Sequence, residues 1–381
     1  MRNFSNIKRI ILKIGSSSLV NKDLSINYKI IVDMMKSFYK LKKENIDVAL
    51  VTSGAIAVGM HELGLNKRPS DMSLKQACAA VGQAKLMEAY NKCASIYELK
   101  TGQILINHDD FQIRNRMLHL SNTLDSMFKN NIIPIINEND ALAVDEIKVG
   151  DNDTLAGLIS PMIKADLLIL FSDIDGLYDK NPKIYEDAVM VDTVSTIDNN
   201  IKKMIGDSTT NVGTGGMITK INAAIIATTS GCNMIICNSN NISNLIKIIK
   251  GENIGTLFLA NDKAISSREH WMIFKAKSKG GIVIDNGLKD ILMTKRVSIL
   301  PKGVISVIGN FSNENVIDIL DINHNIIAKG ITNYSSNEIK MILGHDSNDT
   351  NNILGYEGKN EIVHANNLVH IKEDYYGTDI N

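Results

Sequence analysis

The sequence has little of what marks secreted, disulfide-rich or membrane proteins. Its 381 residues include only four cysteines, which are far apart and form no Cys-x-x-Cys pair: Cys78, Cys93, Cys232 and Cys237. Neither a disulfide framework nor a zinc site is therefore indicated. No stretch reaches the roughly 18 uninterrupted apolar residues of a membrane helix. Lys13 interrupts the first apolar run, which leaves no signal-peptide core. We therefore expect a cytoplasmic protein.

An excess of charge of one sign is also missing. The chain has 41 Lys and Arg against 42 Asp and Glu, a formal net charge of -1. Whole-molecule electrostatics then gives no attraction to nucleic acid or to an anionic membrane, so any anion site must be local. Walker A, dinucleotide G-x-G-x-x-G and protein-kinase H-R-D motifs do not occur. The eight histidines show no H-E-x-x-H spacing, and we predict no histidine metal site.

Short apolar runs alternate with longer amphipathic segments over about the first 260 residues. The pattern predicts strands at residues 9–14, 47–51, 103–106, 132–136, 166–171 and 233–237. It predicts helices at residues 27–44, 74–97, 114–129, 153–164 and 216–230. Because several of these strands are apolar on both faces, we expect an α/β fold with a mostly parallel sheet sandwiched by helices.

The pattern changes near residues 265–280. Beyond them, short β-rich runs at residues 281–284, 304–308, 316–320 and 326–328 are separated by Gly, Asn and Asp turns, which is typical of a small β-barrel. We predict a first domain at 1–262, a linker at 263–277, a barrel-like domain at 278–356 and a C-terminal tail at 357–381. The tail is polar, and we expect it to be poorly ordered.

Polar turns follow the predicted strands. In an open parallel sheet, ligands bind beyond the carboxyl ends of the strands. The turns there are Gly-Ser-Ser-Ser at 15–18, Thr-Ser-Gly-Ala at 52–55, Asn-Glu-Asn-Asp at 137–140 and Ser-Asp at 172–173. Glycine turns with hydroxyl groups alongside can point backbone amides at an anion. Ordinary turn chemistry explains any one of them equally well.

Two lysines have a setting that suits phosphate. The segment Gly-Thr-Gly-Gly-Met-Ile-Thr-Lys at 213–220 runs directly into a predicted helix, where unpaired amides and Lys220 would form a phosphate cradle. A glycine-rich loop with a solvated lysine remains the alternative. Lys13 lies inside an apolar strand, where a charge is costly unless it has a partner. The alternative interpretation of Lys13 is an edge-strand lysine whose ammonium group reaches water.

Gly-Asp-Asn-Asp at 150–153 supplies the acidic complement, at the start of a predicted helix. Helix capping explains one of its aspartates. Asp151 and Asp153 could also hold Mg²⁺, or pair with Lys13 and Lys220 and fix their positions. Lysines, glycine turns and paired carboxylates at one sheet edge favour phosphoryl transfer, which needs positioning and charge stabilisation more than a protein nucleophile.

Five motifs together resemble the glutamate 5-kinases, a family of the amino acid kinase superfamily. They are residues 51–56, 136–140, 149–153, 172–178 and 213–220. Residues 300–304 (Leu-Pro-Lys-Gly-Val) and 309–311 (Gly-Asn-Phe) resemble the PUA domain that many bacterial members carry. The resemblance implies ATP-dependent phosphorylation of the γ-carboxylate of L-glutamate to glutamyl 5-phosphate, the first step of proline biosynthesis.

The resemblance also implies roles for individual residues. Lys13 and Lys220 would neutralise the transferring phosphoryl group, and Asp153 would hold both lysines in place. Mg²⁺ would accompany ATP, with Asp151 as a candidate protein ligand. The implied glutamate-binding residues are Ser53, Asn137, Asp140 and Asn152. The implied ATP-binding residues are Lys13, Ser172, Asp173, Thr214, Gly215, Gly216, Met217, Ile218, Thr219 and Lys220.

Partners are implied in the same way: L-glutamate and ATP as substrates, proline as a feedback inhibitor, and further copies of the chain in a homo-oligomer. An alternative function is an RNA-binding PUA protein whose kinase-like domain no longer catalyses. Acidic residues slightly outnumber basic ones between Ser278 and Tyr356, and aromatic residues there are few, which disfavours RNA. The intact set of Lys13, Asp153 and Lys220 favours the enzyme.

Overall fold

The structure is a computed structural model, and it describes residues 1–142, 152–182, 184–198, 200–201, 204, 216–261 and 264–371. The chain divides into two units, Met1–Ser266 and Ser267–Asn381. Each unit has a sheet and a hydrophobic core of its own. The domain limits expected from the sequence stay a prediction.

The first unit is built on an eight-stranded sheet with the strand order β3-β4-β2-β1-β5-β7-β8-β6. Its neighbouring strands are parallel except for the antiparallel pair β7 and β8. The mostly parallel sheet predicted from the sequence is thus confirmed. The strands are β1 (Arg9–Ile14), β2 (Asp47–Val51), β3 (Lys100–Ile106), β4 (Ile132–Glu138), β5 (Leu167–Ser172), β6 (Thr193–Val194), β7 (Asn233–Asn238) and β8 (Thr256–Phe258).

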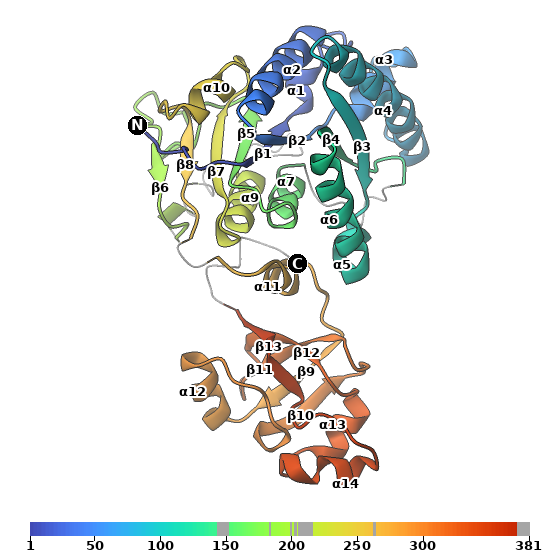
Figure 1. Ribbon diagram of the computed structural model, residues 1–381, viewed down its shortest axis with the longest axis vertical. Coiled ribbons are helices and arrows are strands. Elements are labelled where there is room, and N and C mark those ends of the chain that lie inside the picture. Colours follow the sequence, from blue (N-terminus) through green and yellow to red (C-terminus); the bar gives the residue numbers. More distant parts are fainter. Residues whose placement is uncertain are drawn as a thin grey trace. The chain divides into compact units, whose positions relative to one another are not determined.

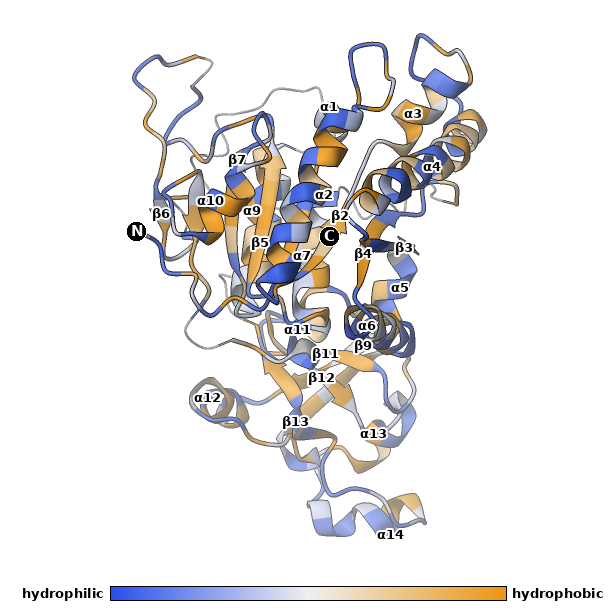
Figure 2. Ribbon diagram, turned by 45° about the horizontal axis from the view of Figure 1, so that its top comes forward, coloured by the Kyte–Doolittle hydropathy of each residue, from blue (hydrophilic) through white to orange (hydrophobic). Residues whose placement is uncertain are grey.

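Helices cover both faces of this sheet (Figure 1). One face carries α6 (Arg114–Lys129), α7 (Asn152–Met162) and α9 (Met217–Thr229). The other face carries α2 (Tyr28–Lys43), α4 (Met72–Ser95) and α10 (Asn244–Ile249). Shorter helices are α1 (Ser16–Leu19), α3 (Ala55–Glu62) and α5 (His108–Gln112). All six residues of β5 are buried, and Figure 2 draws β5 and β7 in the colour of hydrophobic residues. Burial on both faces explains why the middle residues of these strands are apolar.

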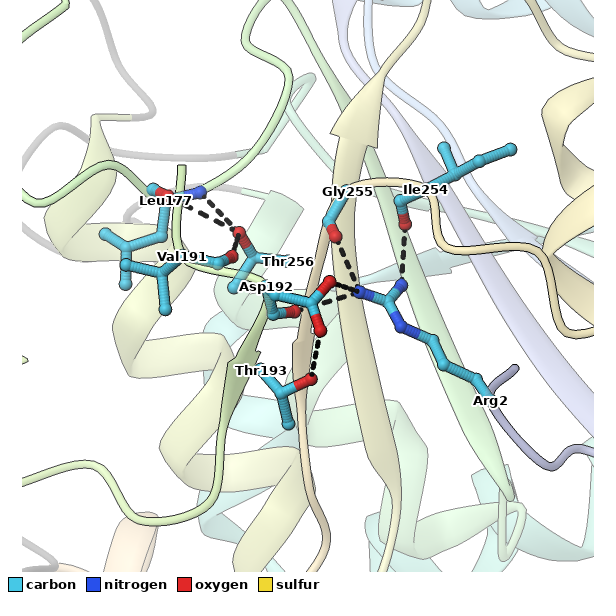
Figure 3. Close-up of polar contacts among 8 residues, drawn as sticks. All are labelled: Arg2, Leu177, Val191, Asp192, Thr193, Ile254, Gly255 and Thr256. Carbon is cyan, nitrogen blue, oxygen red and sulfur yellow. Dashed lines mark hydrogen bonds and ion pairs between the residues drawn. The ribbon is translucent and has the colours of Figure 1, made fainter. Parts of the chain in front are cut away.

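The segment after β5 is fastened to β8 through Thr256, as Figure 3 shows. The buried Thr256 hydroxyl accepts a hydrogen bond from the Leu177 N–H at 2.8 Å and donates one to the Val191 carbonyl at 2.6 Å. Arg2 adds a second fastening, because its guanidinium donates both to the Asp192 carbonyl in this segment, at 2.9 Å, and to the Gly255 carbonyl just before β8, at 2.7 Å. The return of the chain from β5 to the sheet edge is therefore held by paired polar groups.

We expect Thr256→Val to lower the free energy of unfolding by about 1–3 kcal/mol, because it leaves the buried Leu177 N–H and Val191 carbonyl unpaired. Chemical denaturation followed by circular dichroism measures the loss. Thr193→Val is the matched control, since Thr193 is exposed and its hydroxyl donates to the side chain of the neighbouring Asp192 at 3.0 Å. Equal stability of the two variants would contradict the fastening role.

The second unit contains a five-stranded sheet with the order β10-β9-β11-β12-β13. Its pairs are antiparallel except for β9 with β11. An isolated bridge joins Ile299, just before β10, to Val363 of β13 at the other end of the strand order. The strands are β9 (Gly280–Ile284), β10 (Val304–Gly309), β11 (Val316–Leu320), β12 (Ile326–Thr332) and β13 (Val363–His370). The helices are α11 (Ser267–Phe274), α12 (Asn286–Thr294), α13 (Ser336–Ile342) and α14 (Thr350–Leu354), with 3-10 turns at Pro301–Gly303 and Ser347–Asp349.

The structure of this unit differs from two expectations drawn from the sequence. The polar tail expected after residue 356 is wrong for Val363–His370, which forms β13 and pairs with β12. Its Val363 and Leu368 lie in the core of the unit, so the strand belongs to the fold. The expected linker at 263–277 contains the helix α11. In the described ranges, no helix combines the length and hydrophobicity that a membrane span needs.

Candidate active site

Three charged side chains from different elements meet at the carboxyl end of the sheet. Asp153, in the first turn of α7, is fully buried. Its Oδ1 lies 2.5 Å from Nζ of Lys13 in β1, and its Oδ2 lies 3.0 Å from Nζ of Lys220 in α9. Both lysines are also buried, at 8% and 5% exposure. The structure therefore brings together the three residues expected to be catalytic.

The Asp153 carboxyl is held in its charged form by these neighbours. Burial alone would raise the pKa of Asp153, but the charges and hydrogen bonds of Lys13 and Lys220 outweigh burial and hold the pKa below its usual range. Asp153 is thus an anion at neutral pH. A carboxylate between two ammonium groups fixes the positions of both.

Thr219 connects this cluster to the start of α9. Its hydroxyl lies 3.2 Å from Asp153 Oδ2 and donates to the Gly216 carbonyl at 2.7 Å. Gly216 is the N-cap of α9, whose first turn has amide groups directed out of the helix end. Such a helix end attracts phosphate, and Lys220 in the same turn adds a cation.

A second group of side chains forms a network of amides beside the cluster. The Asn152 Nδ2 lies 2.7 Å from the Thr52 carbonyl, 2.7 Å from Ser53 Oγ and 3.0 Å from Asn137 Oδ1. The Asn137 Nδ2 in turn donates to Oε1 of Gln83, at 2.9 Å. Three of the four residues expected to bind glutamate are therefore joined by hydrogen bonds.

The fourth, Asp140, lines a cavity of about 290 Å³. Glu138 at the end of β4 and Gln83 of α4 also line it. Small side chains form much of the remaining wall, which consists of Ala55, Ala79, Ala80, Ala84, Gln103, Leu105, Asn139 and Ala141. Carboxylates and amides on a small-residue wall can accommodate a small polar molecule.

The residues expected at the nucleotide lie at the end of β5. The buried Ser172 donates through its hydroxyl to Asp173 Oδ1 at 3.0 Å, and Asp173 is exposed. Ser239 connects them to the turn after β1: its N–H donates to the Ser172 carbonyl at 2.8 Å, and its hydroxyl lies 2.7 Å from that of Ser18. The sequence analysis did not single out Ser239, although it follows β7 as Ser172 ends β5, so the same strand-end rule could have found it.

The remaining expected residues differ in position. Met217 is half-buried and Ile218 is 44% exposed, both in the first turn of α9. Thr214, Gly215 and Asp151 lie outside the residues that the structure describes. Within the described ranges, no three His, Cys, Asp or Glu side chains form a metal-binding group. Two buried ammonium groups and a helix N-terminus suit the phosphates of ATP, and Mg²⁺ commonly takes most of its ligands from phosphates and water.

Comparison with known proteins agrees with this geometry. Residues 8–238 match the model of the amino acid kinase family, and residues 280–354 match that of the PUA domain. A protein of Caldanaerobacter subterraneus subsp. tengcongensis named glutamate 5-kinase is 42% identical over 361 residues, which cover 95% of this chain and 97% of the relative. A protein of Dictyoglomus turgidum with the same name is 40% identical, covering 96% and 98%.

A solved structure of isopentenyl phosphate kinase is 17% identical to the chain, covers 66% of it and 99% of its own length, and has a TM-score of 0.47. The relatives named above are far more similar and span almost the whole chain. The chain therefore belongs to the amino acid kinase family and, within that family, to the group of the glutamate 5-kinases.

Proposed function

We propose that the protein transfers the γ-phosphoryl group of ATP to the γ-carboxylate of L-glutamate, which gives glutamyl 5-phosphate for proline biosynthesis. The observation that carries this proposal is the buried Asp153 in contact with both Lys13 and Lys220. Relatives named glutamate 5-kinase that match 95% of the chain support the substrate. An intact catalytic cluster also favours an enzyme over an RNA-binding protein that has lost catalysis.

The lysines would act on the charge that moves during transfer. Lys13 and Lys220 stabilise the negative charge on the phosphoryl oxygens, and Asp153 keeps the two ammonium groups in place before the substrates bind. The first turn of α9 with Gly216 and Thr219 binds phosphate. Mg²⁺ neutralises phosphate oxygens when it is bound with ATP. Because the attacking carboxylate is already ionised, the chain needs no general base.

The amide network and the cavity would bind the amino acid. The Asp140 carboxylate suits the α-ammonium group of glutamate. Asn152 Oδ1 is a buried acceptor without a hydrogen-bond partner among the described residues, and it can also accept from an ammonium group. Ser53 and Asn137 hold Asn152 in place through its Nδ2.

An acyl phosphate reacts with hydroxylamine, which gives a direct assay. We expect the purified protein to form γ-glutamyl hydroxamate from L-glutamate, ATP, Mg²⁺ and hydroxylamine, and to form none without ATP. If aspartate, N-acetylglutamate, carbamate or a nucleoside monophosphate were turned over in place of glutamate, the amino acid kinase assignment would stand, and L-glutamate would be rejected as the substrate.

Regulation, assembly and location belong to the same proposal. Addition of millimolar L-proline to the hydroxamate assay tests feedback inhibition, and an unchanged rate would remove it. Homo-oligomerisation is supported by the family resemblance alone, and light scattering measures it. All four cysteines are free and buried, which agrees with a reducing compartment such as the cytoplasm.

A further inference from the structure

Gln83 is brought to the amide network by an unusually close approach of two helices. A Cβ atom on Gly59 of α3 would lie 1.8 Å from the Cys78 carbonyl oxygen, and one on Gly82 of α4 would lie 1.8 Å from that of Ala55. Only glycine allows the two backbones to touch in this way. Since α3 begins just after Ser53, this contact places Gln83, the residue after Gly82, at the substrate end of the sheet.

Two backbone groups determine the direction of the hydrogen bonds in the network. The Glu138 N–H donates to Asn137 at 3.0 Å, so the atom it meets is the oxygen Oδ1. The other end of the Asn137 amide is then Nδ2, a donor, and the Gln83 atom facing it at 2.9 Å is Oε1, an acceptor. The Thr52 carbonyl fixes Asn152 in the same way, because it can only accept.

The consequence is a spare donor on Gln83. Its Nε2 is buried and has no hydrogen-bond partner in the described part of the chain, and the whole residue is only 7% exposed. An unpaired buried donor is costly, and native proteins keep few of them. Gln83 also lines the cavity together with Asp140 and Glu138. A ligand with acceptor oxygens would satisfy the donor.

We propose that Gln83 is a substrate-positioning residue: its Oε1 orients Asn137, and its Nε2 donates to the α-carboxylate of the bound amino acid. This proposal rests on the proposed function. The γ-carboxylate must reach the cluster around Asp153, which is next to Asn152 in the chain. Gln83 lies two hydrogen bonds beyond Asn152, through Asn137, so it meets the end of the substrate that does not react.

Three variants test the proposal in the hydroxamate assay. Gln83→Leu keeps the approximate shape but removes both hydrogen bonds, and we expect the KM for L-glutamate to rise about 10- to 100-fold. We expect kcat and the KM for ATP to stay within about twofold, because Gln83 lies away from the phosphoryl group. Gln112→Leu, the same exchange on α5 outside the network, is the control. Circular dichroism checks that each variant is folded.

Gln83→Glu separates the two hydrogen bonds by pH. In its neutral form the Glu side chain offers an acceptor to Asn137 and an O–H donor in place of Nε2. In its ionised form it can only accept hydrogen bonds, and its charge repels the α-carboxylate of the substrate. Burial raises the pKa of such a carboxyl above its usual value. We expect the KM for glutamate, relative to wild type at each pH, to be near normal at low pH and to rise as the pH increases.

The outcomes separate this proposal from the proposed function. If wild type forms no hydroxamate with L-glutamate, the substrate is wrong, and the role of Gln83 falls with it. If wild type is active, an unchanged KM in Gln83→Leu overturns the role of Gln83 alone. If kcat fell and the KM values for both substrates rose by similar factors, the role of Gln83 would be merely structural. If the KM of Gln83→Glu for glutamate, relative to wild type, did not change with pH, the hydrogen bond from Gln83 Nε2 to the α-carboxylate would be refuted.

Discussion

Asp153→Asn is expected to lower kcat about a thousandfold or more, since it removes the charge that holds both lysines. Asparagine has nearly the same shape, so the change isolates the charge. It leaves a neutral amide against the buried ammonium groups of Lys13 and Lys220. Loss of one partner from a buried ion pair typically costs about 3–5 kcal/mol, so the free energy of unfolding falls as well. The hydroxamate assay and chemical denaturation measure the two effects.

Asp33→Asn is the matched control, because Asp33 lies exposed on α2. It should change neither kcat nor the free energy of unfolding.

The pH dependence of the free energy of unfolding gives an independent check on Asp153. Because the folded-state pKa of Asp153 lies below its unfolded value, its contribution to stability is present above the unfolded pKa and is lost as the pH falls through the folded pKa. Asp153→Asn should remove this acid-dependent part. Turnover near the wild-type rate in this variant would refute the positioning role.

Lys220→Met is expected to lower kcat about 100- to 1000-fold, because it removes one ammonium group from the site of charge transfer. Methionine keeps most of the length and the apolar stem of lysine, so the packing of α9 should survive. The KM for L-glutamate should change little, since the proposed role of Lys220 is at the phosphoryl group. Steady-state kinetics with each substrate varied in turn measures these quantities.

Lys247→Met tests whether loss of a positive charge alone matters, because Lys247 is exposed in the last turn of α10. We expect wild-type kinetics for it. If Lys220→Met retained wild-type kcat, Lys220 would have no part in charge stabilisation. If both lysine variants lost activity equally, the effect would come from overall charge.

The sheet of the first unit could be predicted because its strands are buried on both faces. The six strands expected from apolar runs all occur, within a few residues of the expected limits. The strand β13 could not be found in this way. Three of the four residues in its middle, His364, Asn366 and Asn367, are polar, and buried and exposed positions do not alternate regularly along it. Its position depends on pairing with β12, which lies more than thirty residues away in the sequence.

The charged cluster around Asp153 could be anticipated because strand ends and helix starts of a parallel sheet converge. Lys13, Asp153 and Lys220 each carry such a local signal. Gln83 carries none, since it is one of two glutamines in an alanine-rich helix. Its place in the network follows from the contact between α3 and α4, and Thr219 likewise reaches Asp153 only through the packing of α9 against α7.

The contact of α3 and α4 at Gly59 and Gly82 also limits how such a site can evolve. Two backbones that already touch cannot move closer, and moving them apart would withdraw Gln83 from Asn137. Descendants of this sequence could therefore change ligand preference most easily at the wall, by enlarging Ala79 or Ala84 one methyl group at a time. The helix pair is thus a frame with little freedom to move, and selection for new substrates would act on the alanines around it.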